Sequence, residues 1–292
     1  VFYSMYLRMI IWLASYPKSG NTWIRSLLST YFFSKDGKFN FELLKNIDQF
    51  TSKNIKLNSD KGLDFQSRIS KNWIEAQKII NQDKKIHLFK THNALCAING
   101  NKFTNQLNTV AAIYIVRDPR NLITSLAHHY EFNLNETYNF LTNKRKIIFP
   151  KNFVSQNQKD PDDFNFLGDW GNHYHSWKNI NFCPIQIIRY EDILTDVNKT
   201  FTLLLKFLLK FMQFTIDKKK IDNVIKSTSF EKLSQMESKQ GFYESVTSPQ
   251  SKNKIKFFNL GKKNNWKKLL DVKMIKKIDS KFEKEMKELQ YL

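Results

Sequence analysis

The run TVAAIYIV at Thr109–Val116 limits the possible folds more than any other part of the chain. It has the length of a strand, carries no charged side chain and shows no alternation of polar and apolar residues. Such runs are typical of strands that are buried on both faces, as in a parallel sheet. Shorter runs at Met9–Tyr16, Ile86–Lys90 and Pro184–Arg189 predict further strands.

Helical spacing of apolar residues follows three of these strands. The predicted helices cover Asn21–Phe33, a stretch near Arg120–Tyr130 and a stretch around Asn198–Phe211, and another covers Val272–Leu289. Strands that alternate with helices predict an α/β fold in which helices flank a central parallel sheet. Such sheets bind ligands at the carboxyl ends of their strands.

Some segments show neither pattern. Residues 1–8 are expected to be an irregular extension. Phe132–Phe166 and Gln240–Phe258 lack a helical or strand pattern, and long irregular segments in a compact enzyme commonly form lids or binding loops. We therefore expect one domain over residues 1–292, in which these two segments cover the substrate and the donor.

The charge of the chain favours an anionic partner. Lys and Arg outnumber Asp and Glu by 47 to 27, which gives a formal net charge of +20. The lysines are dispersed, and runs such as Lys218-Lys219-Lys220 are typical of a solvated face. An anionic small molecule therefore fits this charge better than a nucleic acid does.

The cysteines and the apolar runs limit the expected location. Cys96 and Cys183 lie far apart and outside any C-x-x-C spacing, so we expect neither a disulfide framework nor a zinc site. This usage is typical of the reducing cytoplasm. The early apolar run Met9–Tyr16 is far shorter than the ~20 residues that cross a bilayer, so no membrane span is expected.

The sequence YPKSGNTW at positions 16–23 connects the first strand to the first helix. Backbone N–H groups and the helix dipole make such a loop a binding site for phosphate. It is not the usual ATP-binding loop, because Lys18 precedes Gly20 and the first glycine is missing. The alternative is a turn that is capped by Ser19 or Thr22. The spacing favours anion binding.

Two further groups of residues follow strands. Arg117 ends the third strand and Ser125 lies eight residues later, so both can reach one phosphate; the alternative is an ion pair between Arg117 and Asp118. The sequence Lys90-Thr91-His92 follows the second strand. A neutral imidazole can accept a proton from a hydroxyl, although a lone histidine is more often structural. His173 and His175 are expected in a structural helix.

These motifs resemble those of the PAPS-dependent sulfotransferases of cytosolic and bacterial type. PAPS is 3′-phosphoadenosine 5′-phosphosulfate, and PAP is its desulfated product. Pro17–Arg25 is similar to the family's 5′-phosphosulfate loop, and Lys90–His92 is similar to its catalytic segment. The resemblance implies a fold like that of the P-loop kinases. It also implies transfer of a sulfuryl group from PAPS to an acceptor hydroxyl or amine, without a metal.

The resemblance also implies a role for each matching residue. His92 would be the general base, Lys18 would stabilise the leaving phosphate, and Lys90 would add positive charge. Arg117 and Ser125 would bind the 3′-phosphate. The residues that it assigns to donor binding are Lys18, Ser19, Gly20, Asn21, Thr22, Trp23, Arg117, Ser125, Tyr190, Thr228, Phe230 and Gly261.

The chain departs from the family at two places. In the family's F-x-R-K-G segment, Asn259 and Leu260 replace the basic pair here, so only Gly261 carries over directly. Lys262 and Lys263 are the nearest residues that can supply the missing charge. The family's dimer segment aligns with Lys267–Lys276, where two of its residues are replaced, so the oligomeric state stays open.

Other functions stay open on the sequence. A small-molecule kinase of related fold would need a loop ending in G-K-[ST] and a carboxylate for magnesium. A basic polyanion-binding protein without catalysis would need no Lys-Thr-His group at a strand end. The aromatic residues of the two irregular segments suit an apolar or aromatic alcohol as acceptor, and a lipid or sugar hydroxyl is the alternative.

Overall fold

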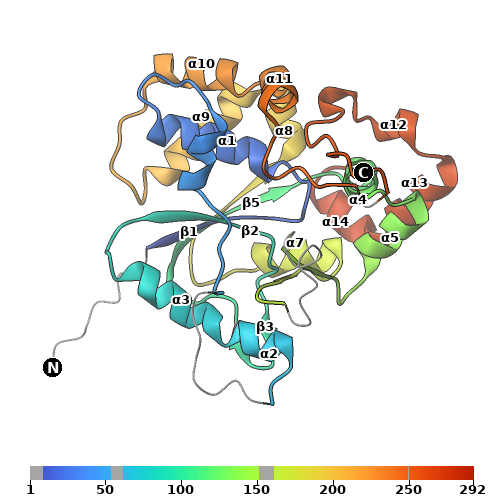
Figure 1. Ribbon diagram of the computed structural model, residues 1–292, viewed down its shortest axis with the longest axis horizontal. Coiled ribbons are helices and arrows are strands. Elements are labelled where there is room, and N and C mark those ends of the chain that lie inside the picture. Colours follow the sequence, from blue (N-terminus) through green and yellow to red (C-terminus); the bar gives the residue numbers. More distant parts are fainter. Residues whose placement is uncertain (1–8, 54–61, 151–160, 249) are drawn as a thin grey trace. The chain divides into compact units, whose positions relative to one another are not determined.

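The computed structural model describes residues 9–53, 62–150, 161–248 and 250–292 (Figure 1). The expected extension at residues 1–8 lies outside this part. The chain forms two compact units. Unit 1 contains residues 1–16, 47–114 and 144–187. Unit 2 contains residues 17–46, 115–143 and 188–292.

Four strands form the main sheet in the order β2-β1-β5-β8. They are β1 (Ile10–Ser15), β2 (His87–Thr91), β5 (Thr109–Val116) and β8 (Ile185–Arg189). β1 and β2 pair in parallel, with Ile10 opposite His87 and Ala14 opposite Thr91. β1 is buried at every position, and β5 at every position but one. The predicted α/β fold with a central parallel sheet is confirmed.

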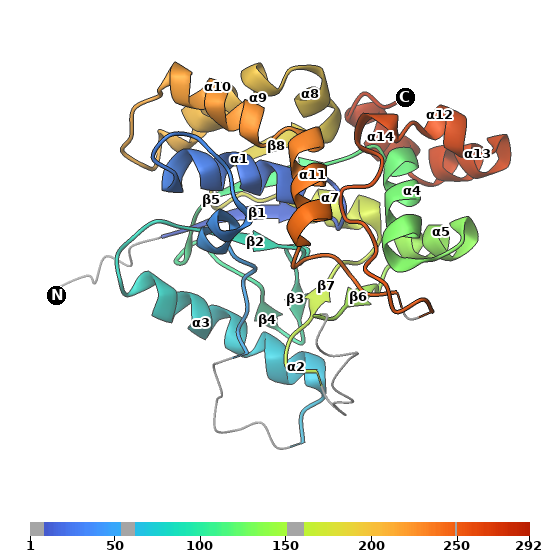
Figure 2. The same ribbon diagram turned by 45° about the horizontal axis from the view of Figure 1, so that its top comes forward.

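The rest of unit 1 packs around aromatic side chains. Trp12 of β1 lies 5.2 Å from Phe50 and 5.0 Å from Phe103 between ring centroids, and its indole N–H donates to Thr109. In Figure 2, helices α2 and α3 follow each other beside the β3–β4 pair. The remaining elements of this unit are α2 (Phe65–Ser70), α3 (Asn72–Asn81), β3 (Ala97–Ile98), β4 (Asn101–Lys102), β6 (Ile147–Ile148), β7 (Asn165–Phe166) and α7 (Trp170–Lys178).

Unit 2 consists mainly of helices. Helix α1 contacts α10, which also contacts α9, and α4 contacts α5, α12 and α13. The helices that begin before residue 200 are α1 (Asn21–Phe33), η1 (Phe41–Asn46), α4 (Pro119–Tyr130), α5 (Leu134–Thr142), α8 (Tyr190–Thr195) and α9 (Val197–Leu208). Those that follow are α10 (Lys218–Ser227), α11 (Phe230–Gln240), η2 (Gly261–Lys263), α12 (Trp266–Leu269), α13 (Val272–Lys281) and α14 (Glu283–Glu288).

Two predicted segments differ from the structure in more than the ends of an element, which elsewhere shift by up to three residues. The segment predicted to be irregular from Phe132 contains α5, which begins with a capping box between Asn133 and Glu136. Residues 151–160 of that segment lie outside the described part. The predicted helix Val272–Leu289 is two helices, because Phe282 leaves the helical conformation (φ −119°, ψ 24°) while its ring stays buried.

The cysteines and the helices bear on the expected location of the chain. Cys96 and Cys183 are not joined by a disulfide. Burial raises the pKa of the Cys96 thiol to about 12. Across the described ranges of the chain, no helix is both long enough and apolar enough to cross a membrane.

Candidate active site

The loop before α1 has an uncommon backbone. Lys18 has φ +67° and Gly20 has φ +103°, a region that favours glycine. A Cβ atom on Gly20 would lie 2.4 Å from Cδ2 of Tyr190, so only glycine allows this contact. Gly20 is the N-cap of α1, and no side chain caps the helix. The alternative of a turn capped by Ser19 or Thr22 is therefore wrong, and the helix end suits an anion.

Arg117 contacts this loop directly. Its Nη1 donates to the carbonyl oxygen of Lys18 at 3.0 Å, and its guanidinium carbon lies 4.4 Å from the centre of the Tyr190 ring. The neighbouring Asp118 pairs with Arg120, at 2.9 Å, and not with Arg117 as the alternative reading required. Arg117 is therefore part of the loop's surroundings.

Several buried polar atoms around the loop lack hydrogen-bond partners among the described residues. They include the donor atoms Oγ of Ser19, Nε1 of Trp23 and Nε of Arg117. A buried donor without a partner costs about 1–3 kcal/mol, so such atoms indicate a ligand with several acceptors. The residues of this loop fit an anionic nucleotide.

The segment after α11 completes the surroundings of Lys18. The Lys18 ammonium lies 3.6 Å from the centre of the Phe257 ring. Gly261 has φ +53°, and a Cβ atom there would lie 2.6 Å from the Phe230 ring. Phe230 begins α11, and Thr228 is buried with its hydroxyl donating to the Val224 carbonyl.

Residues 261–266 are attached to α4, the helix that carries Ser125. Thr124 donates to Oδ1 of Asn264 at 2.6 Å, and Nδ2 of Asn264 donates to the Asn121 carbonyl at 2.9 Å. Ser125 is half-buried, one residue after Thr124. Lys262 and Lys263 are exposed in the short helix η2. Unit 2 therefore contains every residue that the sequence assigned to donor binding.

The first residues of α1 also bind a side chain that the sequence did not indicate. Thr22 donates to Oε2 of Glu244 at 3.0 Å, and the buried Arg25 forms an ion pair with the same carboxylate. Arg25 also donates to the Tyr243 hydroxyl at 3.1 Å. These contacts join positions about 220 residues apart in the sequence, so no local pattern could have indicated them.

Unit 1 holds the predicted general base. Nδ1 of His92 lies 2.7 Å from the carbonyl oxygen of Ser15, and its backbone N–H donates to Asn165. Because a carbonyl only accepts, Nδ1 carries the proton and Nε2 carries the lone pair. That is the tautomer that a general base needs. Lys90 is buried in β2, where its backbone N–H donates to the Asp48 carbonyl.

His173 supports the His92 segment. It lies in α7, as expected of a structural helix, and is fully buried. Its Nε2 donates to the His92 carbonyl at 3.1 Å, and its Nδ1 lies 2.9 Å from the Tyr114 hydroxyl. Burial lowers the pKa of His173 to about 4. Within the described residues, no group of three His, Cys, Asp or Glu side chains is arranged to hold a metal ion.

Comparisons with known proteins agree with this fold and these motifs. The family model for the sulfotransferase domain matches residues 9–290. Human sulfotransferase 2A1 is 22% identical over 282 residues, covering 94% of this chain and 83% of that protein. Mouse sulfotransferase 1B1 is 24% identical over 276 residues, covering 94% and 81%.

Two solved structures have a similar fold at 18% identity. One is mouse sulfotransferase SULT7A1 complexed with PAP, with a TM-score of 0.58 over 96% of this chain and 85% of that one. The other is retinol dehydratase in a complex with retinol and PAP, with a TM-score of 0.60 over 98% and 83%. The chain belongs to the sulfotransferase family. The predicted enzyme class is confirmed.

Proposed function

We propose that this enzyme transfers a sulfuryl group from PAPS to a hydroxyl or amine of a small acceptor. The observation that carries the proposal is the group of buried, unpartnered donor atoms around Lys18 in Ser19, Trp23 and Arg117. These donors suit the phosphate groups of a nucleotide. PAP is the ligand of two proteins that share the fold, SULT7A1 and retinol dehydratase.

Each part of the donor has candidate ligands in this chain. Lys18 and residues 19–22 would hold the 5′-phosphosulfate, and Arg117 with Ser125 would hold the 3′-phosphate. The aromatic rings of Trp23, Tyr190 and Phe230 suit stacking against a base. Tyr190 also contacts Arg117, so the sites for the base and for a phosphate are coupled through these two side chains.

The chemistry divides between two side chains. Bound PAPS supplies a sulfuryl group on a phosphate leaving group. Lys18 stabilises the negative charge that develops on the leaving oxygen, and Nε2 of His92 accepts the proton of the acceptor hydroxyl. Ser15, whose carbonyl orients His92, precedes Lys18 by only three residues in the chain. We infer that both units act together as one sulfotransferase domain over residues 1–292.

Thermal unfolding with PAP, ADP or ATP–Mg²⁺ tests the donor. A ligand at 100 times its dissociation constant stabilises the folded state by about 2.7 kcal/mol. We expect PAP to stabilise the protein without a metal, and Arg117→Ala to lose most of this effect. Arg68→Ala is the control, because Arg68 donates to Pro161 in unit 1. Stabilisation by ATP–Mg²⁺ alone would instead support the kinase.

A further inference from the structure

Residues 245–270 have an uncommon charge pattern. They contain seven lysines and no Asp or Glu. All seven side chains are exposed. The lysines are Lys252, Lys254, Lys256, Lys262, Lys263, Lys267 and Lys268. This segment, which lies between Glu244 and Asp271, therefore presents positive charge to solvent.

Both ends of the first part of this segment are tied to one buried carboxylate. Glu237 of α11 accepts hydrogen bonds from the Ser245 hydroxyl at 2.6 Å and from the backbone N–H groups of Phe257 and Phe258 at 2.6 and 2.9 Å. Between these ends, Thr247 and Lys254 form an antiparallel bridge. The lysines at 252, 254 and 256 thus lie on a folded loop that has a defined position in unit 2.

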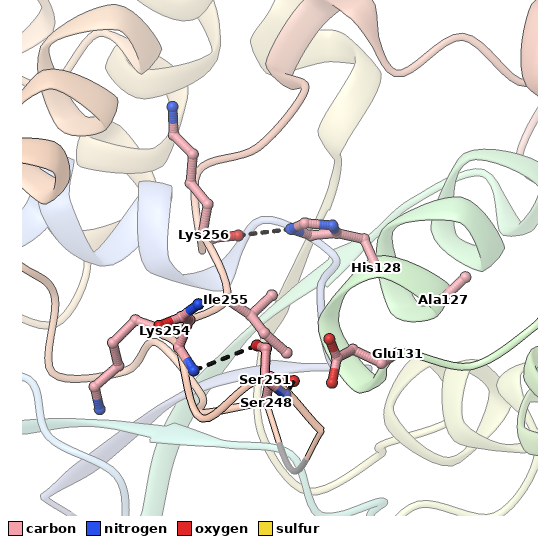
Figure 3. Close-up of a pocket in the computed structure, with 9 residues that line it drawn as sticks. Ala127, His128, Glu131, Ser248, Ser251, Lys254, Ile255 and Lys256 are labelled. Carbon is pink, nitrogen blue, oxygen red and sulfur yellow. Dashed lines mark hydrogen bonds between the residues drawn. The ribbon is translucent and has the colours of Figure 1, made fainter.

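A cavity of about 390 Å³ lies between this loop and the end of α4 (Figure 3). Polar and apolar groups contribute about equally to its lining. Nε2 of His128 donates to the Lys256 carbonyl at 2.8 Å. Figure 3 shows the carboxylate of Glu131 directed toward Ser248 and Ser251. Carboxylate and hydroxyl groups of this kind bind the hydroxyls of a ligand.

The lysine side chains in the cavity wall, Lys254 and Lys256, do not point into the cavity as Glu131 does. In Figure 3, the ammonium groups of Lys254 and Lys256 point away from Glu131, toward the outside of the cavity. The site therefore has hydroxyl-binding groups inside and cationic groups on its rim. An acceptor that has hydroxyls and separate anionic groups matches both parts.

The cavity is close to the residue that handles the leaving group. Lys256 lines the cavity and directly precedes Phe257, whose ring lies under the Lys18 ammonium at 3.6 Å. One residue spans at most ~3.6 Å of chain, so the rim lies a short distance from Lys18. Of the aromatic side chains in the two segments expected to cover the substrate, Phe140 and Phe242 are buried by packing, whereas Phe132, Phe149 and Tyr243 are exposed.

We propose that the acceptor is an acidic saccharide. Its hydroxyls bind in the cavity beside Glu131, Ser248 and Ser251, and its anionic groups bind to Lys252, Lys254 and Lys256. The proposal rests on the proposed function. In the reaction, an acceptor oxygen forms the new S–O bond while the bond from sulfur to the donor phosphate oxygen breaks. The electron pair leaves with PAP, and the acceptor proton goes to His92.

The test compares trigalacturonic acid with galactotriose, its carboxyl-reduced counterpart, as acceptors with PAPS. The measurements are kcat/KM for each acceptor and direct calorimetric binding to the enzyme with PAP bound. We expect a preference of about tenfold or more for the acid, since each exposed ion pair contributes modestly. Galacturonic acid, used as a third acceptor, shows whether the enzyme accepts a single acidic sugar or prefers the trisaccharide.

Two charge variants locate the effect. Lys252→Gln/Lys254→Gln/Lys256→Gln should reduce the preference to below about threefold. Lys199→Gln/Lys206→Gln/Lys210→Gln removes the same charge from exposed positions at α9 and should keep the preference. Both variants should still be stabilised by PAP, which shows that they fold and keep the donor site.

Three results would overturn the proposal. These are equal binding of both trisaccharides, equal effects of the two triple variants, or equally tight binding of a single-stranded oligonucleotide, which would indicate unspecific attraction of polyanions. Failure of PAP to stabilise the wild type would instead contradict the proposed function. The two failures are therefore distinguishable.

Discussion

Tyr114 and His173 share a hydrogen bond of 2.9 Å in the core of unit 1, and both side chains are buried. Because Nε2 of His173 donates to the carbonyl of His92, its Nδ1 accepts the proton of the Tyr114 hydroxyl. This pairing requires a neutral imidazole. It keeps the backbone of His92 in place by a contact that does not change the charge of the site.

The neutral His173 predicts a dependence of stability on pH. Burial lowers its pKa from 6.5 to about 4, so below pH 6.5 the unfolded chain binds a proton that the folded chain does not. Stability from this residue is lost as the pH falls from 6.5 to 4, by at most about 3 kcal/mol. Urea unfolding should show this loss of stability between pH 6.5 and 4 in the wild type but not in His173→Gln. His87→Gln, at a partly exposed histidine of β2, should retain the loss.

Asp163 predicts the opposite dependence. Burial raises its pKa from 3.8 to about 6, so between these values the folded chain keeps a proton that the unfolded chain has lost. Its contribution to stability therefore falls by about 3 kcal/mol as the pH rises from 4 to 6. The difference in the free energy of unfolding between the wild type and Asp163→Asn should follow this dependence on pH. Asp162→Asn, at the exposed neighbour, should leave it in place; a pH-independent difference for Asp163→Asn would contradict the prediction.

Gly20→Ala should abolish PAP binding. The new Cβ atom would lie 2.4 Å from the Tyr190 ring, in addition to the strain at φ +103°. Gly241 also has a positive φ of +74°, but no atom lies within 4 Å of its Cβ position. Gly241→Ala should therefore retain PAP binding at some cost in stability. Calorimetry checks both variants, and a double variant with Tyr190→Ala should recover part of the affinity if the clash is the cause.

Glu237→Gln should loosen the loop between Ser245 and Phe257. Replacing one carboxylate oxygen by an amide nitrogen removes an acceptor from a buried group, which should lower the free energy of unfolding by about 1–3 kcal/mol. Trypsin should also cut faster after Lys252, Lys254 and Lys256. The control is Glu231→Gln, an exposed position on the same helix. Equal cleavage rates in both variants would disprove the role of Glu237.

His92→Gln should separate catalysis from donor binding. Loss of a general base lowers kcat by about 10²–10⁴, while the donor residues of unit 2 are unchanged. PAP should therefore stabilise the variant as much as the wild type. His87→Gln, at the first residue of β2 and five residues before His92, should keep its activity. A kcat within a few fold of wild type in His92→Gln would show that another group accepts the proton.

The local elements could be predicted from the sequence. The strand at Thr109–Val116 and the helix at Asn21–Phe33 have the predicted bounds, because burial on both faces and helical spacing are patterns of adjacent residues. The family could also be predicted, since its loop motif at 17–25 is a continuous run. The break at Phe282 could not, because the ring is buried by tertiary packing while the apolar spacing continues.

The tertiary structure alone decided how the site residues are held. Three hydrogen bonds hold these residues: Glu244 accepts from Thr22, Glu237 accepts from Phe257, and His173 donates to the His92 carbonyl. Each of them joins residues that are separated in the chain. Such contacts depend on which elements pack together, and residue type does not reveal them. The sequence by itself therefore determined the strands, the main helices and the family, and it supplied the residues that we propose for the chemistry. Packing decided the tautomer of His92, the pairing of Asp118 with Arg120, and the burial of the Phe140 and Phe242 side chains.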